Sequence, residues 1–186
     1  MTNTVEELLK FAQLQSEEPE SLDEKVLVDR VFEQLLSSLR AEGDQKGIEL
    51  AFESKIESPA VPGSEAMLKD LFQHIIENAV AFGEQGGRVL VELKDRGEHY
   101  EISVADDGIG ISEDQLEKVF ERFYQVEKFM TRTHEGFGIG RTLRDHIAEL
   151  HGGYIRLESE PGRGTTCFVG LPKDMGGKGA TAKPKD

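Results

Sequence analysis

Hydrophobic residues recur along this chain with two different periods, and each period predicts a different kind of element. Spacings of three and four residues predict helices over 23–44, 64–82, 112–120 and 140–150. Alternating hydrophobic positions predict strands over 48–52, 88–94, 99–105, 154–158 and 165–171. A tight turn at Arg96-Gly97 joins the second and third of these strands. Residues 59–63, with a proline and a glycine at their ends, are predicted to form a loop.

The two ends of the chain differ in pattern from its middle. Residues 1–20 carry one short amphipathic helical stripe and then a polar break. Residues 21–24 have the spacing of a capping box, so the next helix is predicted to begin near Asp23 and to end near Gly43 and Gly47. Residues 174–186 are rich in Gly, Lys, Ala and Pro and are predicted to be a disordered tail. One domain is therefore expected over residues 21–173.

Composition narrows the classes of function. The 186 residues have room for one domain with a real core, and 37% of them are hydrophobic. No apolar run approaches the length of a membrane span and no leader pattern is seen, so a cytoplasmic location is expected. A net charge of -14 disfavours nucleic acid as a partner, and a bound polyanion would need Mg²⁺ or backbone dipoles. Cys167 is the only cysteine, which excludes an intrachain disulfide and a cysteine zinc cluster.

Two glycine runs, at 106–110 and 136–140, are the first sign of chemistry. Asp106 follows a predicted strand, where its carboxylate can accept a hydrogen bond from a ligand amine. The second run leads into a predicted helix, and a helix start with exposed N–H groups is suited to phosphate. Together the runs indicate a nucleotide, although each alone is more often an ordinary turn.

The predicted helix over 64–82 has an apolar face and a separate polar face. His74, Glu77, Asn78 and Ala81 follow one another at helical spacing, beside the hydrophobic stripe. This face has two interpretations, a half-exposed polar surface or a place where the Asn78 amide oxygen is a ligand of Mg²⁺ that carries nucleotide phosphates.

Five segments then occur in a fixed order. They are I-I-E-N-A-V at 75–80, V-A-D-D-G-I-G-I at 104–111, V-F-E-R-F-Y-Q at 119–125, G-F-G-I-G at 136–140 and E-S-E-P-G-R-G-T-T at 158–166. As a set, over roughly residues 21–172, they resemble the catalytic ATP-binding domain of bacterial sensor histidine kinases. The resemblance implies a Bergerat-type α/β two-layer sandwich, with a mixed, mostly antiparallel sheet of about five strands and about three helices on one face.

The resemblance also implies roles for individual residues, with ATP and Mg²⁺ as cofactors. Asn78 resembles the Mg²⁺ ligand, and Asp106 resembles the acceptor for the adenine amine, supported by the hydroxyl of Thr166. Phe120 and Phe123 resemble an aromatic pair that anchors a lid over residues 125–137. The other residues expected at the ATP site are His74, Ala81, Gly108, Gly110, Ile111, Gly136, Gly138, Ile139, Gly140 and Arg141, with Lys128 and Arg132 as lid candidates.

Three positions depart from the family pattern. His74 stands where many members have a second Asn, and Ala81 where a Lys or Arg often reaches a phosphate. Arg141 replaces a residue that is usually apolar, and the hypothesis is that it offsets the cation missing at 81. In related ATPases a Glu at the place of His74 activates water, so the resemblance implies weak ATP hydrolysis here.

The chain lacks the pattern of a phosphoacceptor histidine, so that histidine is expected on a dimerisation domain outside it. Residues 1–20 resemble the end of a dimerisation helix. The expected partners are this dimerisation domain and a downstream response regulator. The parent protein is expected to be a homodimer, and whether it is anchored to a membrane stays open. This chain by itself is compatible with a monomer. Two alternatives stay open: a degenerate nucleotide-binding scaffold, and an anti-sigma-factor serine kinase, which the F-x-x-F segment disfavours.

Overall fold

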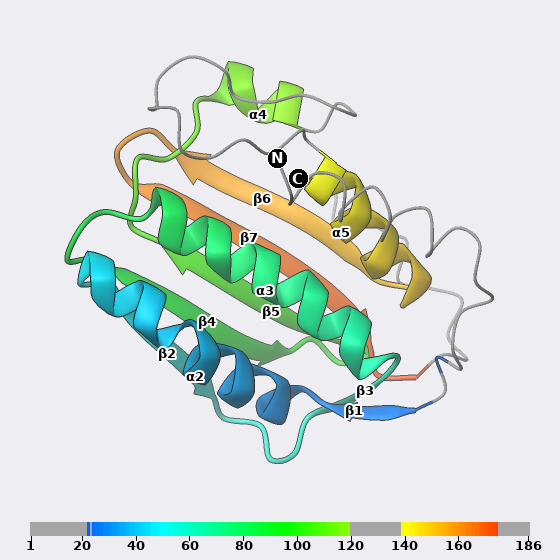
Figure 1. Cartoon of the computed structure of the whole chain (residues 1–186). Coiled ribbons are helices and arrows are strands. Elements are labelled where there is room, and N and C mark those ends of the chain that lie inside the picture. Colours follow the sequence, from blue (N-terminus) through cyan, green and yellow to red (C-terminus); the bar gives the residue numbers. More distant parts are fainter. Residues whose placement is uncertain (1–21, 23, 120–138, 175–186) are drawn as a thin grey trace.

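A mixed sheet with helices on one side forms the body of the protein (Figure 1). The computed structural model describes residues 22, 24–119 and 139–174. The elements are β1 (Lys25–Leu27), α2 (Val28–Lys46), β2 (Glu49–Ser54), β3 (Ala60–Pro62), α3 (Glu65–Phe82), β4 (Arg88–Asp95), β5 (His99–Asp106), α4 (Glu113–Val119), α5 (Ile139–Leu150), β6 (Tyr154–Glu160) and β7 (Gly164–Pro172).

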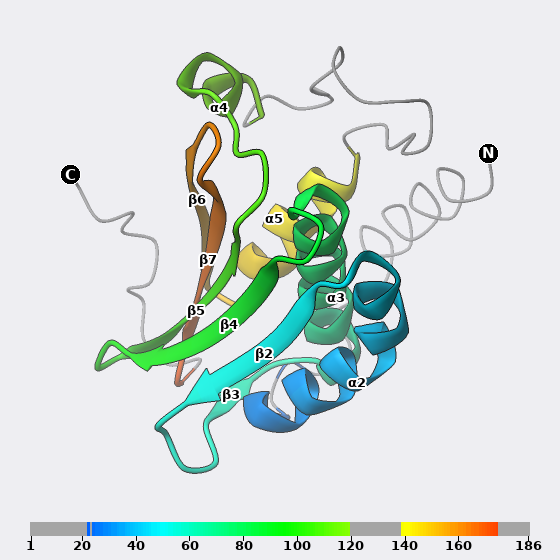
Figure 2. The same cartoon turned by 90° about the vertical axis from the view of Figure 1, so that its left-hand side faces the viewer.

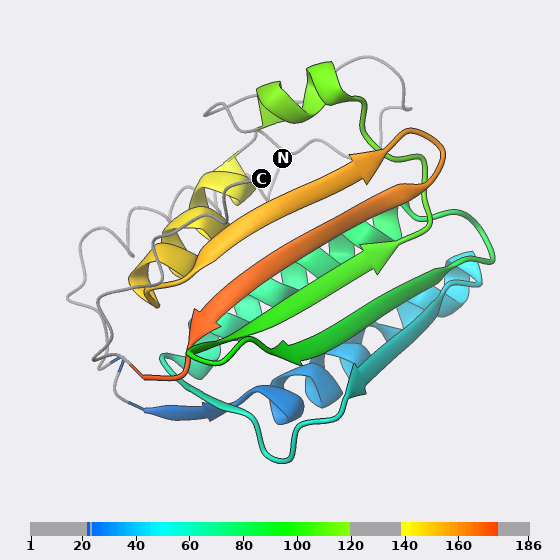
Figure 3. The same cartoon turned by 180° about the vertical axis from the view of Figure 1, so that it is seen from behind.

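The main sheet has five strands in the order β2-β4-β5-β7-β6, and only the β2–β4 pair is parallel. Helices α2, α3 and α5 lie on one face of this sheet, as the edge-on view of Figure 2 shows. Figure 3 shows the strands from the opposite face. The expected two-layer sandwich with a mostly antiparallel sheet is therefore confirmed.

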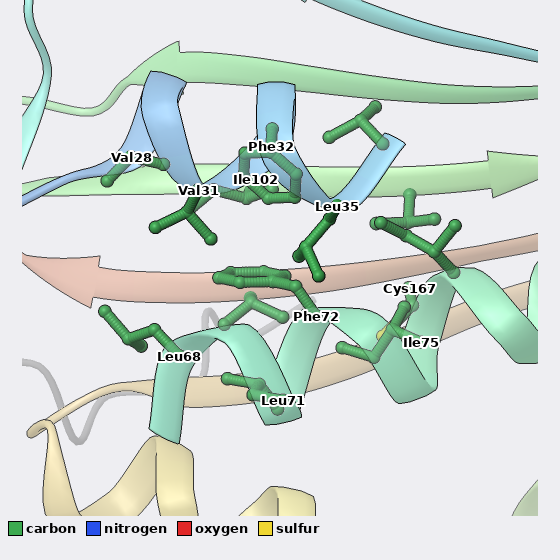
Figure 4. Packing of buried hydrophobic residues seen from close by; sticks show 14 of the residues in the cluster. Val28, Val31, Phe32, Leu35, Leu68, Leu71, Phe72, Ile75, Ile102 and Cys167 are labelled. Carbon is green, nitrogen blue, oxygen red and sulfur yellow. The ribbon is translucent and has the colours of Figure 1, made fainter. Parts of the chain in front are cut away.

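The hydrophobic core lies between the sheet and these helices. Phe32 of α2 is 0% exposed and packs between Phe52 of β2 and Phe72 of α3, with ring centroids 5.2 and 4.7 Å away. Figure 4 shows Phe72 of α3 lying toward the side chains of α2, with Leu68, Leu71 and Ile75 in the same cluster. The apolar stripes predicted for both helices are buried here, which fixes the rotation of each helix about its axis.

The predicted start of the first helix is wrong. Residues 25–27 form β1 and pair antiparallel with β3, and β3 lies in the stretch predicted as a loop. Val26 and Val61 face each other in this small sheet and are both buried. The capping pattern at 21–24 predicts a helix start there, but burial of Val26 and Val61 in the β1–β3 pair contributes more free energy than a helix cap.

Gly43 lies inside α2, and the helix ends at Lys46 with Gly47 as its left-handed cap. A Cβ on Gly43 would lie 3.0 Å from the Ile48 carbonyl oxygen, so this glycine serves a close approach of helix and strand. The other predicted elements that the structure describes agree with it to within a few residues. Residues 1–20, the lid over 125–137 and the tail beyond residue 174 lie outside the described residues.

Candidate functional site

Asp106, at the end of β5, lies where the loop after this strand meets the start of β7. Its Oδ1 atom accepts hydrogen bonds from the Gly108 N–H at 3.0 Å and from the Thr165 N–H at 3.2 Å. Both bonds use the same oxygen, so Oδ2 is the oxygen that can accept from a ligand. The local chain thus orients a carboxylate and leaves it one acceptor to offer.

The pKa of Asp106 is raised above its ordinary value. Burial is the largest cause, because a half-buried carboxylate loses part of its hydration. The N–H groups of Gly108 and Thr165 act in the opposite direction, and the negative charge of Asp107 adds to the increase. Such a shifted carboxyl at the end of a central strand is typical of a binding site.

The glycines around Asp106 allow the backbone to pack tightly. A Cβ on Gly108 would overlap the carbonyl oxygen of Phe82 at the end of α3, and one on Gly164 would overlap the carbonyl oxygen of Asp106. Gly110 has φ +66° and lies against the Glu160 carbonyl oxygen in the same way. The structure therefore gives Gly108 and Gly110 a role in joining the loop to α3 and to the turn between β6 and β7.

Thr165 lies beside Asp106, whereas the expected support of Asp106 by the Thr166 hydroxyl stays a prediction. Cys167 of β7 is buried in the core, and side chains alternate along a strand, which places Thr166 on the opposite face. Thr165 supplies the N–H that Asp106 accepts. Counting the alternation back from buried Val169 and Cys167 would have identified it.

Ser159 is a residue that the sequence reasoning missed. Its Oγ accepts a hydrogen bond from the Ile111 N–H at 2.7 Å, and it lies 2.8 Å from both the Gly164 carbonyl oxygen and Thr165 Oγ1. It thereby ties the loop that follows Asp106 to the β6–β7 turn. A signal existed, because Ser159 continues the inward-facing positions Ile155 and Leu157 of the same strand.

Helix α3 carries the predicted polar residues on one side. Ser64 is its N-cap and accepts from the Met67 N–H, while the apolar residues are buried in the core. Asn78 is exposed, and His74 and Ala81 are half-buried. His74 Nδ1 donates to the Asp70 carbonyl at 2.6 Å, and Arg144 Nη1 of α5 lies 3.5 Å from the His74 carbonyl oxygen. The Asn78 amide is thus free of the core and available at the surface of the helix.

Two large apolar side chains remain exposed near Asp106. Phe82, the last residue of α3, is 45% exposed, and Ile109 is 52% exposed. The Ile109 N–H points to the Phe82 carbonyl oxygen at 3.4 Å, so the two residues are adjacent. An exposed aromatic side chain whose own backbone packs against the loop after Asp106 is suited to stacking on a planar base. Phe82 was not among the residues expected at the site and stood only as the end of the predicted helix.

The phosphate side of the expected site is described only in part. Ile139, Gly140 and Arg141 lie in the first turn of α5. Phe120, Phe123, Lys128, Arg132, Gly136 and Gly138 lie outside the described residues. The structure therefore brings together Asp106, Gly108, Gly110 and Ile111, and the phosphate-side residues stay predictions.

Asn78 is a suitable single protein ligand for Mg²⁺, because its amide oxygen is a hard donor on an exposed helix surface. In the described part of the chain, no three His, Cys, Asp or Glu side chains gather to hold a metal ion. Mg²⁺ would thus need phosphate oxygens and water as its remaining ligands, as is usual for this ion.

The described helices include none long and apolar enough to cross a membrane.

Comparisons with known proteins place this geometry in context. Residues 63–175 match the family described as histidine kinase-, DNA gyrase B-, and HSP90-like ATPase. The sensor-like histidine kinase SenX3 of Mycolicibacterium smegmatis is 32% identical over 173 residues, which cover 93% of this chain and 45% of SenX3. This chain therefore spans less than half the length of that relative.

Solved structures of histidine kinases are similar in fold. Full-length ShkA in complex with AMPPNP is 26% identical with a TM-score of 0.78, and the match covers 90% of this chain and 35% of ShkA. The histidine kinase ThkA in complex with the response regulator TrrA is 22% identical with a TM-score of 0.70, covering 91% of this chain and 47% of ThkA. The likeness to ThkA shows the fold alone.

Proposed function

This chain belongs to the family of histidine kinase-, DNA gyrase B- and HSP90-like ATPases, and on this basis we propose that it is the ATP-binding catalytic domain of a sensor histidine kinase. One observation carries the proposal most. Asp106 is oriented by two N–H groups that bind one carboxylate oxygen, which leaves the other to accept from the adenine amine. The name of the relative SenX3 and the AMPPNP bound to ShkA support the same assignment.

The adenine side of the site is proposed to lie between Asp106 and Phe82. The Asp106 carboxylate accepts from the exocyclic amine, and the exposed Phe82 ring stacks on the base. Guanine presents a carbonyl oxygen where adenine has its amine, and that oxygen would face the carboxylate. The arrangement therefore favours ATP over GTP by repulsion of the wrong base as well as attraction of the right one.

Asn78 is proposed to hold the Mg²⁺ that accompanies the phosphates. When bound, the ion neutralises charge on the phosphate oxygens. Asn78 lies one turn before Phe82 on α3, so the same helix presents the metal ligand and the stacking ring. The strongly acidic chain needs such a cation, because its net charge of -14 opposes binding of a polyanion.

The phosphates are proposed to lie at the start of α5. Backbone N–H groups at a helix N-terminus bind anions, and Gly136, Gly138 and Gly140 would let a phosphate approach closely. Arg141 is proposed to supply the positive charge that Ala81 lacks, with Lys128 and Arg132 contributing from a lid over residues 125–137. These groups hold the γ-phosphate in position, which is most of what phosphoryl transfer asks of a protein.

The acceptor of the phosphate is proposed to be a histidine on a dimerisation domain, after which a response regulator takes it. Residues 1–20 are proposed to be the end of a helix of that domain, in a homodimeric parent protein. His74 replaces the carboxylate base of related ATPases, so water is activated poorly and ATP is kept for transfer.

A second candidate is a nucleotide-binding scaffold that transfers no phosphate. Ala81 favours it, because the position lies on the polar side of α3 without a cation. A transfer assay separates the two candidates, since both of them bind ATP.

The test has a binding step and a transfer step. Calorimetric titration of ATP with and without Mg²⁺ should show affinity that Mg²⁺ strengthens, and Asn78→Ala should lose most of that Mg²⁺ dependence. Gln34→Ala, which removes an exposed amide on α2, is the matched control and should leave binding unchanged. Addition of the dimerisation domain of the parent protein with labelled ATP should then yield phosphohistidine. Absence of ATP binding refutes the proposed function, and binding without transfer favours the scaffold.

A further inference from the structure

The last turn of α3 is held by a side chain from another helix. Lys46, the final residue of α2, donates from Nζ to the Val80 carbonyl at 2.9 Å and to the Ala81 carbonyl at 2.6 Å. These carbonyls belong to the end of α3, where intrahelical donors run out and a positive charge is favourable. Lys46 therefore fixes the segment that leads into Phe82.

The turn between α3 and β4 is held by two segments, the end of α2 and the loop that follows Asp106. The Lys46 carbonyl accepts from the Gly86 N–H at 3.1 Å. On the other side, Asp107 Oδ2 accepts from the Arg88 N–H at 2.9 Å, and the Asp107 carboxylate lies where a Cβ on Gly87 would be. The connection from α3 to β4 is thus held between the end of α2 and the loop after Asp106.

We propose that Lys46 is a positioning residue for the base of the nucleotide. It sets the place of the Phe82 ring and of the Phe82 carbonyl, against which Gly108 packs directly beside Asp106. This inference rests on the proposed function, because it concerns the adenine side of the ATP site. The family resemblance assigns no role to Lys46.

We expect Lys46 to influence the position of Phe82 but not that of Asn78, because most of α3 is held by its own packing in the core. Ile75, Ile76 and Ala79 anchor the body of the helix in the core, so Asn78 keeps its place without help from Lys46. Phe82 lies beyond that anchor and is 45% exposed. Loss of Lys46 should therefore loosen the stacking ring and leave the metal ligand where it is.

The experiment measures ATP affinity by calorimetry, with and without Mg²⁺, for the whole chain and its variants. Lys46→Met should weaken ATP binding about tenfold, as expected for loss of charged hydrogen bonds that order the pocket, and the ratio of affinities with and without Mg²⁺ should not change. Lys46→Arg should restore most of the affinity. Lys69→Met, which breaks an ion pair with Glu65 at the far end of α3, is the control and should bind as the wild type does.

The outcomes are distinguishable. Unchanged ATP affinity in Lys46→Met overturns the inference, even where the unfolding temperature falls, because Lys46 would then be only a helix cap. Loss of the Mg²⁺ dependence together with affinity also overturns it, since the whole helix would have moved. If Lys46→Met does not fold, Lys46→Gln replaces it: its amide is uncharged and one bond shorter than the lysine side chain, so ATP binding should again weaken, and unchanged affinity there overturns the inference. A wild-type chain that binds no ATP refutes the proposed function and this inference with it.

Discussion

Replacement of Asp106 by Asn is the sharpest test of the adenine side, because it changes one atom and keeps the local fold. The amide oxygen of the Asp106→Asn variant would still accept from the N–H groups of Gly108 and Thr165. The second carboxylate oxygen, in contrast, becomes an NH₂ group that points its hydrogens at the amine of adenine. Burial also raises the pKa of Asp106, so a neutral amide removes a cost of burying charge and should leave the fold at least as stable.

The magnitude follows from the loss of one charge-assisted hydrogen bond. Such a bond contributes about 1.5–3 kcal/mol, which corresponds to roughly 10- to 150-fold in affinity. The opposed N–H groups of amide and amine place the expected loss for ATP near the upper end, about 100-fold. The same reasoning predicts that the wild type binds the triphosphate of unsubstituted purine riboside, which lacks the amine, about tenfold or more weakly than ATP.

The assay is calorimetric titration of both proteins with ATP and with the purine riboside triphosphate. The wild type should prefer ATP strongly, and Asp106→Asn should lose this preference, because it has no acceptor for the amine and its NH₂ group opposes it. Thermal unfolding of both proteins checks that the fold is intact. Equal ATP affinity in wild type and variant, with both folded, would refute the assignment of Asp106 to the base.

Three further predictions concern stability and the phosphate side. Phe32→Ala should lower the free energy of unfolding by about 3–5 kcal/mol in a denaturant titration, since the ring is fully buried between two other rings. Phe32→Leu should lower it by less than half as much, and equal losses for the two variants would argue against tight packing around the ring. Burial lowers the pKa of His151, which is neutral in the fold with Nδ1–H donating to the Ile147 carbonyl and Nε2 accepting from the Ser64 N–H. As the pH falls below about 6.5, His151 is protonated in the unfolded chain before it is protonated in the fold, so the stability of the fold should decrease with falling pH. Between a pH of about 7.5 and one of about 5.5, the melting temperature should therefore fall less for His151→Gln than for the wild type. Arg141→Ala should weaken ATP binding severalfold but leave binding of adenosine unchanged. Unaltered ATP affinity in a titration would show that Arg141 does not supply the positive charge that position 81 lacks.

The elements of the fold were predictable where a local pattern and tertiary burial agree. The stripe on α3 and the alternation in β4 are buried as predicted, because each has enough hydrophobic positions at one period to define one face; in β5, Glu101 and Ser103 on the other face are buried as well. The pair β1 and β3 was not predictable in this way. Each of these strands has only three residues, and their stability comes from pairing between segments that are distant along the chain.

The residue types expected to meet a nucleotide follow from local sequence alone: an aspartate after a strand, an asparagine on the polar side of a helix and glycines in the loops between them. The neighbours that orient these residues follow from the packing of distant elements. Thr165 lies beside Asp106, Ser159 joins two loops, Phe82 lies at the surface and Lys46 reaches the end of a helix that follows it in the chain. Motifs depend on backbone geometry within a few residues, whereas the facing of a strand, the exposure of a ring and the reach of a lysine depend on how separate elements pack.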